Sequence, residues 1–163
     1  VASLAVLLLG FVLPAPGAAY TEPPLPAVAS GRIERLALPA AGPVPARPVD
    51  VWLPPGYPEH APYAIAVMFD GQMLFDAGTT WNRQEWRVDE TAAALQASGR
   101  TRPFIVVGVW NPGAARHAEY FPQRPFEALP LSVREALRHE AKRGEAPLFS
   151  ANVYSDAFLR WID

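Results

Sequence analysis

Two runs of apolar residues stand out along the chain: AIAVMF at 64–69 and FIVVGVW at 104–110. Strands that are apolar on both sides are typical of parallel sheets covered on both faces. Between the two runs, residues 88–97 form an alanine-rich stretch followed by Gly99, which predicts a helix and its end. The order strand, helix, strand predicts a βαβ unit with a right-handed crossover.

Weaker patterns predict two more strands and two more helices. Residues 49–53 alternate in polarity and stop at Pro54-Pro55-Gly56, while residues 32–38 alternate only in part. Ser132 and Glu135 form a capping box, which predicts a helix running to about residue 142. A last helix is predicted over 156–163, because its apolar residues share one face: Phe158, Trp161 and Ile162.

The first residues resemble an export signal. An apolar stretch at 4–13 is followed by Pro14, Pro16 and the small residues Gly17-Ala18-Ala19. This stretch is shorter than the roughly 20 apolar residues that span a bilayer, so no stable membrane insertion is expected. Because the chain starts with Val and no basic residue precedes the apolar stretch, we expect the signal to be incomplete. The predicted organisation is a signal peptide at 1–19, a Pro-rich linker with a first strand at 20–48, and an α/β domain at 49–163. Export implies a periplasmic or extracellular protein.

Composition narrows the classes of function. The net charge is −2 with no basic stripe, which argues against a nucleic-acid partner. The chain has no cysteine, so disulfides, thiolate metal sites and a cysteine nucleophile are excluded. The 19 prolines divide it into short elements. No spacing of acidic residues indicates a metal site, and we expect no cofactor.

The segment VMFDGQMLFD, residues 67–76, carries the main functional signal. A buried strand is expected to end at Phe69, and ligands bind just outside the carboxyl ends of parallel strands. Gly71 is expected to turn with positive φ, and Asp70 to accept a local N–H bond in an Asx-turn. We expect this turn to close a central strand of the sheet.

Taken together, several segments resemble a family of esterases within the α/β-hydrolase superfamily. This family includes enterochelin esterases, antigen 85 mycolyltransferases and feruloyl esterases. The pattern is VDVWLPPGY, the strand ending in Asp-Gly, and IVVGVWN with a downstream Arg116 and Glu119; SDAFLRWID resembles the helix before the nucleophile strand. The resemblance implies an incomplete α/β-hydrolase fold, with a mostly parallel central sheet flanked by helices and truncated before the nucleophile elbow.

The resemblance also implies a partial active site. The backbone N–H of Gln72 would be one oxyanion-hole donor. Candidate substrate-binding residues are Asp70, Gly71, Trp81 and Arg116. A surface ion pair between Arg116 and Glu119 is the simpler interpretation of those two charges. No serine lies in a G-x-S-x-G motif, so the catalytic triad is absent. In this fold the catalytic histidine comes after the serine along the chain. The three histidines here precede the place expected for that serine, so they are interpreted as surface or supporting residues: His60, His117 and His139.

The sequence therefore predicts an exported serine carboxylic-ester hydrolase acting on a small-molecule ester, present as a fragment that is inactive alone. One alternative is a non-catalytic exported binding protein of the same fold, in which Trp81, Trp86 and Trp110 would hold the ligand. A weaker alternative is a proline-rich β-sandwich adhesion module, against which the helical patterns count.

Overall fold

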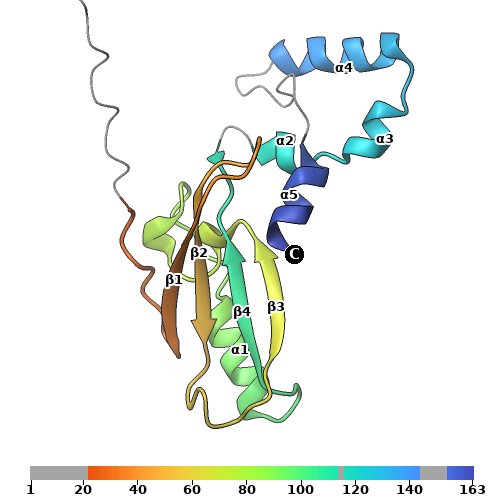
Figure 1. Ribbon diagram of the computed structural model, residues 1–163. Helices are drawn as coiled ribbons and strands as arrows, with labels where there is room; N and C mark the ends of the chain where they lie inside the picture. The colour runs from red at the N-terminus through yellow and green to blue at the C-terminus, as the bar shows by residue number, and fades with distance from the viewer. Residues whose placement is uncertain (1–21, 114–115, 144–153) are drawn as a thin grey trace, which may run out of the picture.

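The computed structural model describes residues 22–113, 116–143 and 154–163. A small sheet carries one helix, α1, packed along its length, and the helices α2 to α5 gather at one end (Figure 1). The strands are β1 (Arg32–Leu38), β2 (Arg47–Leu53), β3 (Ala64–Phe69) and β4 (Phe104–Val109). The helices are the short 3₁₀ turns η1 (Gly71–Met73) and η2 (Ala77–Thr79), then α1 (Val88–Ala97), α2 (Arg116–Tyr120), α3 (Gln123–Glu127), α4 (Leu131–Arg143) and α5 (Ser155–Ile162).

The sheet is mixed, which corrects the predicted fold class. Its strand order is β1-β2-β4-β3, and the β1–β2 and β2–β4 pairs are antiparallel, whereas only β3 and β4 run parallel. The prediction of a mostly parallel α/β-hydrolase sheet, which the resemblance implied, is therefore wrong. The connections explain this result, because parallel neighbours need a long crossover and only the β3–β4 connection contains a helix, α1.

The position of β3 is a second correction. Among the described residues β3 is an edge strand, so the turn at Asp70 does not close a central strand. The βαβ unit itself is confirmed: β3 and α1 have the predicted bounds, and β4 pairs with β3 in parallel from Ala64 opposite Phe104 to Phe69 opposite Val109. The sequence did not predict η1, η2, α2 or α3.

Two apolar clusters hold the sheet, one on each face. On the α1 face, Trp52 and Val106 pack with Leu74, Phe75 and Ala92. The second cluster forms where α5 crosses the carboxyl end of β3 and contains Val44, Val49, Val109 and Phe158. The Phe158 ring lies 5.4 Å from that of Phe69, centroid to centroid. Because α5 has only eight residues, it covers this face of the sheet only near the carboxyl end of β3.

Strand β3 is consequently half covered. Its residues alternate between partly buried and exposed, and the exposed ones share the α5 face. Ile65 is 66% exposed, Val67 51% and Phe69 38%. The expectation that this apolar run is buried on both faces is wrong, because α1 packs only on the opposite face.

Two carboxylates fasten the segment before β1 to the body of the molecule. Asp89, at the start of α1, accepts hydrogen bonds from the Ala29 and Ser30 amides at 2.8 and 3.2 Å. Asp76 accepts one from the Ala27 amide at 2.9 Å. The predicted signal peptide at 1–19 lies outside the described residues. Within the described ranges, no helix combines the length and apolarity needed to cross a bilayer.

Candidate functional site

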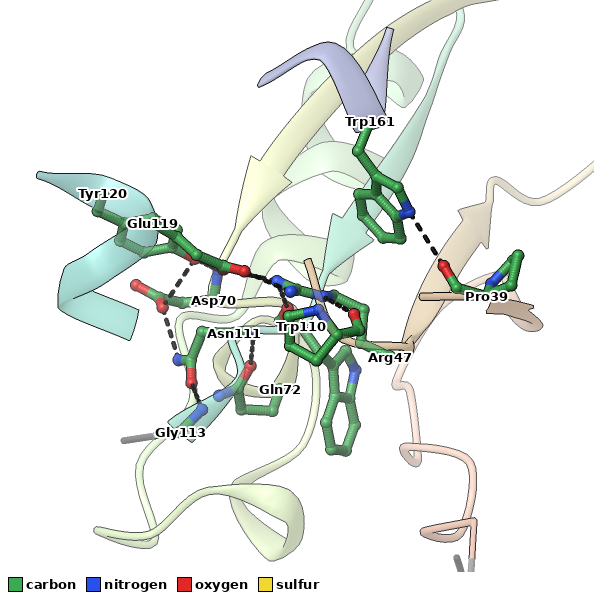
Figure 2. Close-up of polar contacts among 11 residues, drawn as sticks. Pro39, Arg47, Asp70, Gln72, Trp110, Asn111, Gly113, Glu119, Tyr120 and Trp161 are labelled. Atoms are coloured by element: carbon green, nitrogen blue, oxygen red, sulfur yellow. Dashed lines mark hydrogen bonds and ion pairs between the residues drawn. The ribbon is translucent and has the colours of Figure 1, made fainter. Parts of the chain in front are cut away.

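The loops that follow the two parallel strands meet in one polar cluster (Figure 2). Asp70 comes directly after β3, and Asn111 follows β4 by two residues. The Asn111 amide nitrogen Nδ2 donates to Asp70 Oδ1 at 2.7 Å, and the Asn111 backbone N–H donates to Gln72 Oε1 at 3.1 Å. Side chains about forty positions apart in the sequence thus join the carboxyl ends of β3 and β4. The carboxyl ends of parallel strands are where such sheets usually bind ligands.

Helix α2 supplies the counter-charge to Asp70. Arg116 donates through Nε and Nη2 to the two carboxylate oxygens at 2.8 and 2.6 Å. One helical turn later, the Tyr120 hydroxyl lies 3.3 Å from Asp70 Oδ1, and the Arg116 guanidinium sits over its ring at 4.7 Å from the centroid. The Asp70 side chain is 10% exposed and that of Arg116 39% exposed. The guanidinium therefore keeps one side open to solvent.

The electrostatics of the cluster keep Asp70 ionised. Burial raises the pKa of its carboxyl, but the hydrogen bonds from Arg116 and Asn111 and the Arg116 charge together hold the pKa below its usual value. The bond to Asp70 raises the pKa of Arg116 in turn. Burial, followed by the charge of Asp70, raises the pKa of the Tyr120 hydroxyl. At neutral pH the three groups are thus an anion, a cation and a neutral phenol, suited to fixing a geometry rather than to proton transfer.

The backbone of the turn differs from the predicted one. Asp70, rather than Gly71, has positive φ, at 57°, and its side chain makes no local capping bond. Gly71 is required for a different reason, since a Cβ there would lie 2.5 Å from the Gly108 carbonyl oxygen. The turn therefore sits directly against β4. Asp70 tolerates the left-handed conformation because its carboxylate is held by Arg116 and Asn111.

Gln72 lies at the centre of the turn and is fixed at two of its polar groups. Its Oε1 accepts from Asn111, and its carbonyl oxygen accepts from the Thr79 hydroxyl at 2.8 Å. The amides of Met73 and Leu74 close the 3₁₀ turn onto Asp70 and Gly71. In contrast, the Gln72 backbone N–H has no hydrogen-bond acceptor in the described part of the chain. Among the described residues, this N–H is therefore a backbone donor that is not used within the fold.

Two of the three candidate tryptophans, Trp81 and Trp86, lie in the loop between η2 and α1. Trp81 is 87% exposed and Trp86 51% exposed, so neither contributes a fully packed ring to the core. The loop is braced, because the Trp86 amide donates to the Met73 carbonyl at 2.9 Å and the Gln84 amide to the Thr80 hydroxyl at 2.9 Å. Trp81 is therefore an exposed ring on a fixed loop.

The predicted pair between Arg116 and Glu119 is not formed. Arg116 binds Asp70, and Glu119 forms a buried two-bond ion pair with Arg47, at the start of β2. Glu119 is 1% exposed. This ion pair fixes α2 against the sheet and so positions Arg116 and Tyr120. The sequence analysis missed Tyr120 as part of the cluster, although its spacing of four from Arg116 on a helix would have placed both on one face.

The three histidines take no part in this site. His60 and His139 are exposed and His117 is half-buried. Within the described residues, no hydrogen bond joins their side chains to Asp70, Gln72 or Asn111.

A search of known protein families finds no match to this chain, and no curated protein matches its sequence.

Proposed function

We propose that this chain supplies the oxyanion-binding part of an exported serine carboxylic-ester hydrolase. The observation that carries the proposal is the Gln72 backbone N–H. It is unsatisfied within the described residues, while the carbonyl oxygen and the side chain of the same residue are both held by hydrogen bonds. Attack on an ester builds negative charge on the carbonyl oxygen. A donor already held in position stabilises that charge without reorganising, and one such donor is worth about 3 to 4 kcal/mol of barrier.

The residues around Asp70 would hold the Gln72 N–H in position. Arg116, Asn111 and Tyr120 hold Asp70 in its left-handed conformation, and Asn111 also holds the Gln72 side chain. None of the serines in the sequence lies in G-x-S-x-G, so the proposed reaction needs a nucleophile from outside these 163 residues. Residues 1–163 alone are expected to hydrolyse no ester.

The test removes the N–H while keeping the turn. In the polypeptide encoded by the whole reading frame around these residues, Gln72→Pro deletes the donor, and Gln72→Ala deletes only the side-chain bond to Asn111. We expect Gln72→Pro to lower kcat on p-nitrophenyl esters by about 100- to 1000-fold and Gln72→Ala to lower it far less. Melting curves check that both variants fold. Equal activity of the folded Gln72→Pro variant and the parent would overturn the proposal.

The exposure of Trp81 favours one alternative, a binding protein without catalysis. A flat ring that is 87% exposed on a braced loop suits stacking against a flat ligand. Under this alternative, no p-nitrophenyl ester is turned over by the whole polypeptide. Trp81→Ala would then abolish ligand binding, while Gln72→Pro would leave binding unchanged.

A further inference from the structure

Trp110 follows β4 directly, and hydrogen bonds hold both its backbone and its side chain. The backbone N–H donates to the Pro48 carbonyl at 3.3 Å, and the carbonyl oxygen accepts from Arg47 Nη1 at 3.3 Å (Figure 2). The indole Nε1 donates to Asp50 Oδ2 at 2.7 Å. The indole N–H is therefore used inside the fold, although the sequence analysis counted this ring among those that would hold a ligand.

The Asp50 carboxylate that accepts the indole bond is itself fixed. Asp50 lies on β2, opposite Arg35 of β1, and its side chain is 0% exposed. Arg35 donates through Nε to Asp50 Oδ1 at 2.6 Å and through Nη2 to Oδ2 at 2.9 Å. The Arg35 guanidinium also lies over the Trp110 ring, 5.0 Å from its centroid. The two strands thus hold both the N–H and one face of the indole ring.

The indole ring in turn lies against the turn that carries Gln72. A Cβ at Gly71 would lie 2.8 Å from Trp110 Cδ1 and 2.5 Å from the Gly108 carbonyl oxygen, so the Gly71 backbone packs closely on both. The residue after Trp110, Asn111, donates through its backbone N–H to Gln72 Oε1. The peptide unit that joins Gly71 to Gln72 contains the Gln72 N–H. A displacement of Gly71 therefore displaces that donor.

We propose that Trp110 is a positioning residue, which sets the Gln72 N–H through its contact with Gly71. Asp50 and Arg35 hold the indole ring in the orientation that this contact requires. Without its hydrogen bond to Asp50, the ring can occupy other staggered rotamers and leave Gly71 without this neighbour. The effect on catalysis rests on the proposed function, since a displaced donor stabilises an oxyanion less.

Trp52 of β2 provides a matched control. Its side chain is fully buried, and its Nε1 donates to the Ser30 carbonyl at 2.7 Å, the same length as the bond of Trp110. A Cβ at Gly31 would lie 2.8 Å from Trp52 Nε1, so this ring also packs against a glycine, but one outside the turn. Trp110→Phe and Trp52→Phe each delete one indole hydrogen bond beside a glycine. A general loss of packing would affect both variants alike.

The first measurement does not need activity. In the polypeptide encoded by the whole reading frame around these residues, labelled with ¹⁵N-glutamine, the Gln72 amide signal is the one that is absent from Gln72→Pro. We expect its order parameter to be about 0.85 in the parent and in Trp52→Phe, and about 0.6 or below in Trp110→Phe. Arg35→Lys, which keeps the charge but loses the two-bond contact, should also lower it. Arg32→Lys, on the same strand, should leave it unchanged.

The second measurement is the hydrolysis of p-nitrophenyl esters by the same polypeptides. Trp110→Phe should lower kcat by about 10- to 100-fold with little change in KM, whereas Trp52→Phe should change kcat by less than about 2-fold. Circular dichroism checks that each variant is folded. If Trp110→Phe does not fold, the comparison of Arg35→Lys with Arg32→Lys decides the question.

Equal order parameters at Gln72 in the two tryptophan variants, or equal losses of kcat, would overturn the positioning role of Trp110. A parent polypeptide that hydrolyses no ester would instead overturn the proposed function. In that case the order parameters alone decide whether Trp110 positions the turn.

Discussion

Breaking the buried ion pair between Arg47 and Glu119 is expected to destabilise the protein strongly. Their side chains are 2% and 0% exposed, and two hydrogen bonds join them. The Arg47 guanidinium also lies 5.2 Å from the Phe158 ring centroid and 5.1 Å from that of Trp161. Glu119→Gln keeps the shape of the side chain but leaves the guanidinium buried without its anion. The cost of such a change is about 3 to 5 kcal/mol of unfolding free energy.

The assay is reversible unfolding in urea, together with thermal melting. For a chain of this size, the expected loss lowers Tm by roughly 6 to 20 °C. Arg47→Met with Glu119→Leu removes both charges and fills the same space, so the double variant should be much closer to the parent than Glu119→Gln. If Glu119→Gln loses less than about 1 kcal/mol, or the double variant loses as much as the single one, the ion pair does not fix α2 as argued.

Two further changes probe the turn and the start of α1. Gly71→Ala should lose about 1 to 3 kcal/mol of unfolding free energy, because the new Cβ would lie 2.5 Å from the Gly108 carbonyl oxygen; urea titration measures it, and a neutral effect would show that β4 can move away. Burial and the neighbouring Glu90 raise the pKa of Asp89. A carboxyl whose pKa is raised on folding favours the folded state below its unfolded pKa, and this contribution is lost as pH rises through the raised value. Asp89→Asn should therefore gain stability relative to the parent as pH rises from 4 to 8 in melting experiments, and a constant difference over that range would contradict this.

The local elements were largely determined by the sequence. The bounds of β1, β3 and α1 follow from apolar periodicity and from the residues that end each element. The parallel pairing of β3 and β4 follows from the helix between them, since a crossover leaves few alternatives. The Gln72 turn was located by its place after a strand, although the residue with positive φ was assigned to Gly71 instead of Asp70.

Only the tertiary structure decided how these elements assemble. An apolar run such as AIAVMF is the same whether one or both of its faces are covered, so periodicity could not place β3 at an edge. Likewise, the partners of Arg116 and Glu119 are Asp70 and Arg47, which lie 46 and 72 positions away. Such pairs depend on where strands and helices meet, because a charge pairs with whichever opposite charge the fold brings within reach. Sequence spacing carries that information only within a single element.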